Sequence, residues 1–248
     1  MSTLNKPLIT VIMPVFNEEE NISQSLSSLI RVVRQDLYKK NRWPTEVLII
    51  DDGSTDQSIN IIKNIIKDQQ ITRLIRHDKN KGKGSAISTA LSYARGDICI
   101  IQDADLEYNP SDLSKLLKPL ITGKAHVVYG SRFLSLKYYN GLWSNLLGNK
   151  VLSLAGSLLI RRHITDIMTC YKAFFRNQLK NVKAASFDVE PEISAKLLLD
   201  RNINFIELPI NYNPRLEGKK IKKLDGFISL WRLITTIVSV QRETLFKK

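Results

Sequence analysis

The sequence predicts an α/β protein with a mostly parallel central sheet and helices on both faces. In the first half of the 248-residue chain, short runs rich in Val, Ile and Leu alternate with segments of helical spacing. Near-continuous apolar strands of this kind are typical of parallel sheets that are buried on both sides. Apolar residues make up 43% of the chain, which is enough for a sizeable core.

Five apolar runs of the first half are expected to be strands. They are residues 8–13, 46–50, 71–76, 97–102 and 126–129. The first run ends at Pro14, and the second is closed by the polar turn Asp51-Asp52-Gly53-Ser54. Each run is too short for a buried helix and is bounded by polar or turn-forming residues, which favours strands.

Helices are expected between these strands, because apolar residues recur three or four positions apart. They are residues 18–39, a segment around Ile59, Ile62 and Ile66, residues 84–94 and residues 110–120. Ser54 or Thr55 is the expected cap of the second helix. Pro110 fits the first turn of the last one.

The second half of the chain is less regular. Segment 142–160 is apolar and long enough for a membrane span, but Lys150 inside it is costly in hydrocarbon. We therefore expect one or two helices, packed on the sheet or lying in a bilayer interface. A helix over 189–200 and a strand over 203–212 are expected next. The strand is expected at an edge of the sheet because Pro209 is tolerated only there.

The last segment, residues 226–248, is expected to be an amphipathic helix that follows one domain over residues 1–225. Arg232 and Arg242 interrupt its apolar residues. Two interpretations stay open: the helix docks on the domain, or it anchors the protein in a membrane interface. The basic cluster 219–223, which anionic lipid would attract, is consistent with the second, and neither is preferred.

The chain carries 37 Lys and Arg against 24 Asp and Glu, a net charge of +13. Such an excess attracts nucleotides, nucleic acid or an acidic membrane face. No basic strand interleaved with aromatic residues and no helix-turn-helix pattern supports nucleic acid. Two cysteines give no disulfide framework, and residues 1–7 lack the apolar core of a signal peptide, so the expected compartment is the cytoplasm.

Three polar clusters follow the expected strands. They are Phe16-Asn17-Glu18, Asp51-Asp52-Gly53-Ser54 and Asp103-Ala104-Asp105. Ligands of parallel sheets bind beyond the carboxyl ends of the strands, and the two carboxylates of the third cluster can point at one hard cation such as Mg²⁺. The convergence predicts a nucleotide–metal site. The glycines at 82 and 84 fit neither the Rossmann nor the P-loop spacing, which excludes dehydrogenase and ATPase functions.

These motifs together resemble glycosyltransferase family 2, in particular its dolichyl- or polyprenyl-phosphate sugar synthases. The resemblance runs in order from about Leu8 to Gly226. It is carried by residues 11–18, 50–56, 80–84, 103–105, 130–133, 165–172, 187–192 and 214–220. It implies a GT-A fold, which is Rossmann-like, and a UDP- or GDP-sugar donor. It does not indicate the sugar or an oligomeric state.

The resemblance also implies residue roles on the donor side. The residues that it places at the nucleotide are Pro14, Phe16, Glu18, Ile50, Asp52, Lys83, Asp103 and Ala104. Asp52 is the expected base-reading carboxylate, although helix capping is an alternative role for it. Asp103, Asp105 and Glu107 would hold Mg²⁺ or Mn²⁺ against the diphosphate.

On the acceptor side, Arg132 matches the arginine that grips the acceptor phosphate, because a planar guanidinium binds phosphate through two bonds. Lys172, Arg215, Lys219 and Lys220 are further candidates at the acceptor phosphate and the diphosphate. Asp105, Arg132 and Asp166 are the candidate catalytic residues.

The implied activity is an inverting transfer of a hexose from a nucleotide-diphosphate sugar to a polyprenyl phosphate, such as dolichyl or undecaprenyl phosphate. Such a phosphate is already largely ionised near neutral pH and needs no general base. The alternative is a hydroxyl of a glycan or glycolipid, which needs a base, with Asp166 as the candidate. Membrane contact is expected to be peripheral, at the cytoplasmic face, through residues 136–160 and the C-terminal helix.

Overall fold

The computed structural model of the chain describes residues 6–134, 143–180, 182–183, 188–214 and 223–245. Within these ranges a seven-stranded sheet has the order β3-β2-β1-β4-β6-β5-β7. The strands are β1 (Ile9–Val15), β2 (Thr45–Asp51), β3 (Thr72–Arg76), β4 (Ile98–Ile101), β5 (Val127–Ser131), β6 (Lys172–Phe175) and β7 (Phe205–Pro209). All neighbouring strands are parallel except the pairs that β6 makes with β4 and β5. The predicted mostly parallel sheet is confirmed.

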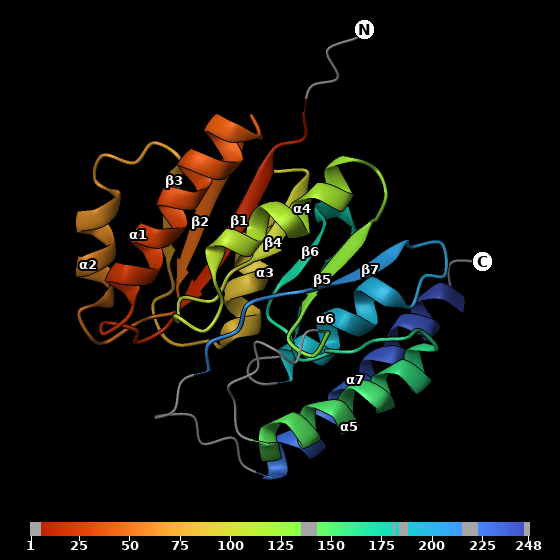
Figure 1. Cartoon of the computed structure of the whole chain (residues 1–248). Helices are drawn as coiled ribbons and strands as arrows, with labels where there is room; N and C mark the ends of the chain where they lie inside the picture. Colours follow the sequence, from red (N-terminus) through yellow and green to blue (C-terminus); the bar gives the residue numbers. More distant parts are fainter. Residues whose placement is uncertain (1–5, 135–142, 181, 184–187, 215–222, 246–248) are drawn as a thin grey trace, which may run out of the picture.

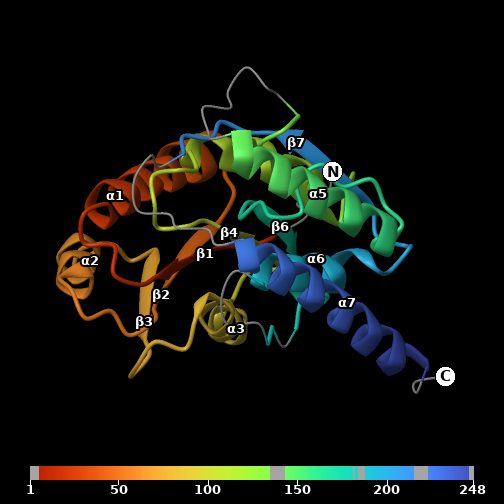
Figure 2. The same cartoon turned by 90° about the horizontal axis from the view of Figure 1, so that it is seen from below.

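Helices cover both faces of the sheet, as Figures 1 and 2 show for α1 and α3 on opposite sides. The α-helices are α1 (Ile22–Val32), α2 (Ser58–Ile66), α3 (Lys83–Tyr93), α4 (Leu113–Ile121), α5 (Trp143–Ile160), α6 (Val189–Leu198) and α7 (Lys223–Leu245). A π-helix, Val33–Lys40, continues α1, and short 3₁₀ turns lie at Pro110–Asp112 and Arg176–Gln178. Every residue of the central strands β1 and β2 is buried, as their continuous apolar pattern predicts.

The start of α2 differs from the prediction. Neither Ser54 nor Thr55 caps this helix, which begins at Ser58. The carboxylate of Asp56 accepts a hydrogen bond of 2.9 Å from the Ser58 N–H instead. The Ser54 hydroxyl accepts from the N–H of Asn17 at 3.0 Å, and so ties the loop after β2 to the loop after β1.

Strand β6 is not predicted by the sequence. It has only four residues, begins with a charged Lys172, and pairs with β4 and β5, which are distant in sequence. A run this short has no periodicity that separates it from a loop. Strand β7, by contrast, lies at the edge of the sheet as Pro209 predicts.

Helices α5 and α7 lie side by side on one side of the molecule, and α7 also packs against α6 (Figures 1 and 2). Segment 143–160 is a single helix. Each of the two helices has an apolar stripe exposed to solvent: Leu147, Val151, Leu154 and Leu158 in α5, and Phe227, Trp231, Ile234 and Val238 in α7. No helix in the described part of the chain is both long and apolar enough to cross a bilayer.

Candidate active site

The loops after β1 and β2 meet at the carboxyl edge of the sheet. Pro14 and Ile50 are register partners in the last part of their strands. The side-chain amide oxygen of Asn17, a residue with positive φ, accepts from the Thr55 N–H at 2.9 Å. The Glu18 N–H donates to Ser58 Oγ at 2.8 Å. Of the residues predicted at the nucleotide, Pro14, Ile50 and the loop with Glu18 therefore lie together at this edge. Phe16, in the same loop, is partly exposed.

Asp52 organises the loop that leads into α3. Its carboxylate is buried and accepts from the backbone N–H groups of Lys81 at 3.0 Å and Gly82 at 2.7 Å. His77 Nδ1 lies 2.6 Å from the same carboxylate. Gly82 is the N-cap of α3 and has a φ of 89°, a conformation that glycine adopts without strain. Asp52 thus fixes the start of α3 and the position of the loop that carries Lys81. Nothing in the sequence indicated that His77 contacts Asp52.

A chain of alternating charges runs from the protein interior to Asp103. Lys172 is fully buried, and its ammonium lies 2.5 Å from one carboxylate oxygen of Glu190. The other oxygen of Glu190 is 3.0 Å from the ammonium of Lys83. Lys83 in turn lies 2.7 Å from Asp103.

Both lysines in this row of alternating charges, Lys172 and Lys83, are held by neighbouring carboxylates. Burial lowers the pKa of Lys172, and the carboxylate of Glu190 opposes that effect only in part. Lys172 also donates to the carbonyl oxygens of Ile167 and Thr169. The side chain of Lys83 is 28% exposed, so Lys83 is the member that reaches the surface of the site together with Asp103.

The segment that carries Asp105 and Glu107 folds back on itself. The Glu107 N–H donates to the Asp105 carboxylate at 3.2 Å. Glu107 is buried and accepts from the Tyr212 hydroxyl at 2.9 Å, while its carbonyl oxygen accepts from the Asn213 N–H. Ala104 is buried between the two aspartates. Tyr212 therefore holds Glu107 toward the segment after β7, a contact that the sequence did not indicate.

Arg132 and Asp166 form a buried bidentate pair at the end of β5. The Nε and Nη2 groups of Arg132 each donate to an Asp166 oxygen at 2.7 Å, and the Arg132 backbone N–H donates to the same carboxylate. The guanidinium also lies over the rings of Phe133 and Tyr212, at 5.4 and 5.2 Å from their centroids. Burial acts to lower the pKa of Arg132, but the Asp166 carboxylate, together with Tyr108 and Tyr212, outweighs burial and raises that pKa.

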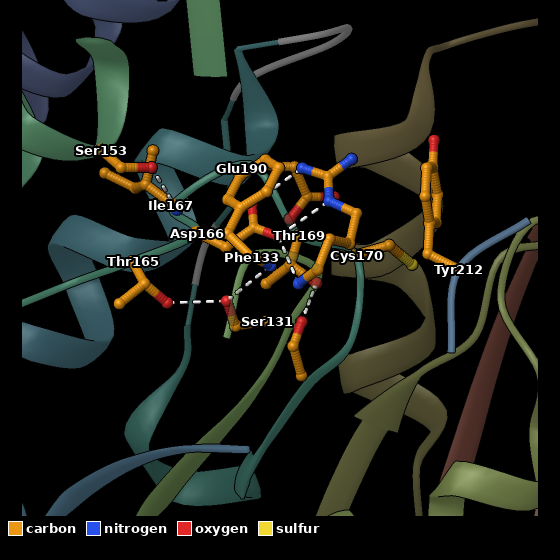
Figure 3. Close-up of polar contacts among 12 residues, drawn as sticks. Ser131, Phe133, Ser153, Thr165, Asp166, Ile167, Thr169, Cys170, Glu190 and Tyr212 are labelled. Atoms are coloured by element: carbon orange, nitrogen blue, oxygen red, sulfur yellow. Dashed lines mark hydrogen bonds and ion pairs between the residues drawn. The ribbon is translucent and has the colours of Figure 1, made fainter. Parts of the chain in front are cut away.

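The loop that carries Asp166 is itself fixed from two sides, as Figure 3 shows in part. Thr165 and Ser131 share a hydrogen bond of 2.6 Å between their hydroxyls. The carboxylate of Glu207 on β7 accepts from the backbone N–H groups of Thr165 at 2.8 Å and Asp166 at 3.2 Å. Burial raises the pKa of Glu207. Arg132 is thus positioned through Asp166 by a carboxylate, that of Glu207, which lies outside every sequence motif.

The carboxylates of Asp103 and Asp105 suit a hard divalent cation. Mg²⁺ is usually held by one or two carboxylates together with the phosphates of a substrate, and Asp103 and Asp105 supply two such groups. Within the described ranges no three His, Cys, Asp or Glu side chains are grouped so that they alone could hold an ion. A cation at this place would therefore need the diphosphate as a further ligand. Arg215, Lys219 and Lys220 lie outside the described residues.

Residues 10–182 match the family model described as Glycosyl transferase family 2. The chain belongs to this family. The match covers well over half of the 248 residues, and it confirms the predicted membership. The chain is therefore a glycosyltransferase.

Curated relatives of this family 2 glycosyltransferase are similar over nearly its whole length. A UDP-N-acetylglucosamine–dolichyl-phosphate N-acetylglucosaminyltransferase of Methanococcus voltae is 28% identical over an aligned length of 250 residues, and the match covers 92% of this chain and 95% of the relative. A dolichyl-phosphate beta-glucosyltransferase of Trichomonas vaginalis is 27% identical and covers 91% of this chain and 72% of the relative. The names of both relatives specify a dolichyl-phosphate acceptor.

Solved structures confirm the predicted GT-A fold. Mannosyl-3-phosphoglycerate synthase from Rubrobacter xylanophilus has a TM-score of 0.68 at 14% identity, over 96% of this chain and 75% of that one. A mannosyltransferase from Pyrobaculum calidifontis in complex with GDP-Man and Mn²⁺ has a TM-score of 0.56 at 20% identity, over 98% and 76%. At these identities the likeness concerns the fold alone.

Proposed function

We propose that this family 2 glycosyltransferase transfers a hexose, with inversion, from a UDP- or GDP-sugar to a polyprenyl phosphate. The proposal draws on the dolichyl-phosphate relatives. The structural observation that carries it is the pair of exposed apolar stripes on α5 and α7. Strand β1 runs toward the end of the molecule where these helices lie (Figure 1), so a lipid-linked acceptor at the stripes would have its phosphate near the site.

On the donor side, we assign Asp103 and Asp105 to Mg²⁺ or Mn²⁺ and Phe16 and Glu18 to the nucleotide. A cation there would stabilise the negative charge that grows on the departing nucleoside diphosphate. Lys83, which already pairs with Asp103, would contact the diphosphate from the start of α3. Lys172 is fully buried behind Glu190, so its contribution is to position Lys83 and not to touch the substrate.

On the acceptor side, we assign Arg132 to the acceptor phosphate. Its Nε and Nη2 groups are used by Asp166, so the two-bond contact with phosphate expected from the sequence is not available on that edge of the guanidinium, and Nη1 is the group that would meet a phosphate oxygen. Asp166 fixes the plane of the guanidinium. The loop with Arg215, Lys219 and Lys220 would add positive charge from the segment before α7.

The geometry at Asp166 favours a phosphate acceptor over a hydroxyl acceptor. A hydroxyl needs a general base within hydrogen-bond reach, and Asp166, the candidate for that role, is fully buried with both oxygens accepting from Arg132. A phosphate monoester, with a second pKa of about 6, is mostly ionised at neutral pH and attacks without a base.

We further propose that the enzyme is a peripheral protein on the cytoplasmic face of a membrane. We treat residues 1–225 as the catalytic domain and 226–248 as its membrane-facing helix, which in the structure begins at Lys223. The apolar stripes would lie in the interface, while the buried sides of α5 and α7, with Ile160, Leu233 and Ile237, stay packed on the domain.

The test is transfer by the purified protein with Mg²⁺ or Mn²⁺, radiolabelled UDP- and GDP-sugars and a short polyprenyl phosphate. The expected product partitions into organic solvent, is released by mild acid, and has the anomeric configuration opposite to that of the donor. Transfer only to a glycan or glycolipid hydroxyl, with an acid-stable product, would establish the alternative acceptor. Absence of any metal-dependent thermal shift with UDP or GDP would contradict the donor site.

A further inference from the structure

A basic pocket lies between α6, α7 and the segment around residues 177–183, apart from the candidate active site. Its volume is about 510 Å³. Lys180, Lys183, Lys196 and Arg232 line it, and the one carboxylate in its described lining is Glu192. Lys196 lies six residues after Glu190 in α6, which is about 9 Å along the helix axis. The pocket therefore has an excess of positive charge, and none of Glu190, Lys83 and Asp103 is among its described lining residues.

Buried acidic groups hold two of the cationic side chains at this pocket, those of Lys196 and Arg232. Glu192 is buried, lies 2.7 Å from the ammonium of Lys196 and accepts from the backbone N–H of Lys183 at 2.8 Å. The Nε group of Arg232 donates to Asp188 at 2.7 Å. A guanidinium has five N–H donors, so this pair uses only part of the donor capacity of Arg232. The wall that α7 contributes also contains hydroxyl groups, including that of Thr235.

The α7 wall of the pocket begins beside the exposed apolar stripe of this helix, at Arg232 and Thr235. Phe227 and Trp231 on this stripe are 77% and 70% exposed. Arg232 and Thr235 follow Trp231 by one and four residues, and at about 100° per residue they lie within roughly a quarter turn of it. Leu233, on the other flank, faces Gly156 of α5. When such a stripe lies in the acyl boundary of a bilayer, groups on the adjacent flank lie at headgroup depth.

We propose that this pocket binds the phosphate of an anionic phospholipid headgroup where the enzyme docks on the membrane. The inference rests on the membrane location in the proposed function. Phosphate oxygens accept charge-assisted hydrogen bonds from lysine and arginine, and the apolar stripe beside the pocket receives the acyl chains of the same lipid. Free phosphate would satisfy the cations alone, whereas a lipid satisfies both surfaces.

The test is sedimentation of the full chain with vesicles of phosphatidylcholine and with vesicles that also contain phosphatidylglycerol. The variant is Lys180→Gln with Lys183→Gln, and the matched control is Lys63→Gln with Lys67→Gln at α2, which removes the same charge away from the pocket. We expect the pocket variant to bind phosphatidylglycerol vesicles roughly thirtyfold more weakly, about 2 kcal/mol for two lysines near an anionic surface. The control should lose much less.

Three outcomes would overturn the proposal. Equal losses in the pocket variant and the control would show general attraction of a basic protein. Equal binding of wild type to both vesicles would show that no anionic headgroup is recognised. Competition by millimolar inorganic phosphate as effective as that by phosphatidylglycerol vesicles would assign the pocket to a free anion. Transfer to a short polyprenyl phosphate in detergent is measured in parallel. If the wild-type protein shows no such transfer, the proposed function is contradicted and the pocket is not.

Discussion

Replacing Glu190 by Gln tests whether the buried lysine at the base of the charge chain depends on this carboxylate. Gln has nearly the same size, so the substitution removes charge and little packing. Lys172 is fully buried, and Glu190 is 2.5 Å from its ammonium. Removing one partner of a buried ion pair costs about 3–5 kcal/mol. Because Lys172 keeps its bonds to two carbonyl oxygens, we expect about 3 kcal/mol, or a Tm lower by about 6–12 °C.

The loss should depend on pH in one direction. Burial already lowers the pKa of Lys172, and without Glu190 that pKa falls further. Between this pKa and the ordinary lysine value of about 10.4, the unfolded chain binds more protons than the folded one, so the free energy of unfolding rises with pH. The difference between wild type and Glu190→Gln should therefore shrink as the pH is raised from 7 toward 10.

Urea denaturation of both proteins at several pH values measures this difference. Glu192→Gln is the matched control, because it lies two residues further along α6 and its partner Lys196 reaches solvent at 16% exposure. The control should lose less stability, and its loss should not shrink with pH in the same way. A Glu190→Gln loss that is no larger than the control's, or that stays constant with pH, would refute the reasoning.

Four further results are expected. Asp105→Asn keeps an oxygen that can accept from the Glu107 N–H but removes the charge of a proposed cation ligand, so transfer should fall by about a hundredfold or more with an unchanged circular dichroism melt; transfer at the wild-type rate would refute the metal assignment. Arg132→Lys keeps the charge and loses the planar fork, so transfer to polyprenyl phosphate should fall more than hydrolysis of the donor, and equal losses would argue against an acceptor role. Gly53→Ala places a Cβ 2.5 Å from the Lys79 carbonyl carbon at a φ of +73°, so stability to urea should fall by more than about 1 kcal/mol; an unchanged midpoint would contradict the close approach. Burial raises the pKa of Cys99 to about 12 and raises that of Cys170 as well, so a thiol reagent at pH 8 should label neither in the native protein and both in urea, and rapid native labelling would contradict their burial.

The predictable part of the fold is the part with long, regular patterns. The buried strands β1, β2 and β4 are recognisable because their apolar runs are continuous and end in polar turns. The position of β7 follows from one residue, Pro209, which cannot donate a hydrogen bond in the middle of a sheet. The three acidic loops are expected at one edge because parallel strands share the direction of their carboxyl ends.

The rest depends on contacts between distant residues. The π-helix after Val32 and the four-residue β6 leave no periodic signal in the sequence. The partnership of Arg132 with Asp166 joins residues 34 positions apart, and Lys83 meets Glu190 across 107 positions. Sequence motifs mark these residues as candidates without showing that Asp166 is buried under Arg132. Tyr212 and Glu207 have no motif at all, although they fix Glu107 and the Asp166 loop.

The antiparallel strand β6 has a consequence for how the chain folds. Within the described residues, β6 lies between β4 and β5 in the sheet and pairs with both. About seventy residues nevertheless separate β4 from β6 in the sequence. During synthesis, β1 to β4 emerge first and leave one side of β4 with unpaired backbone groups, a template for pairing with other chains. Completion of the sheet then waits for a segment near residue 172, so β4 is the place where aggregation during expression should begin.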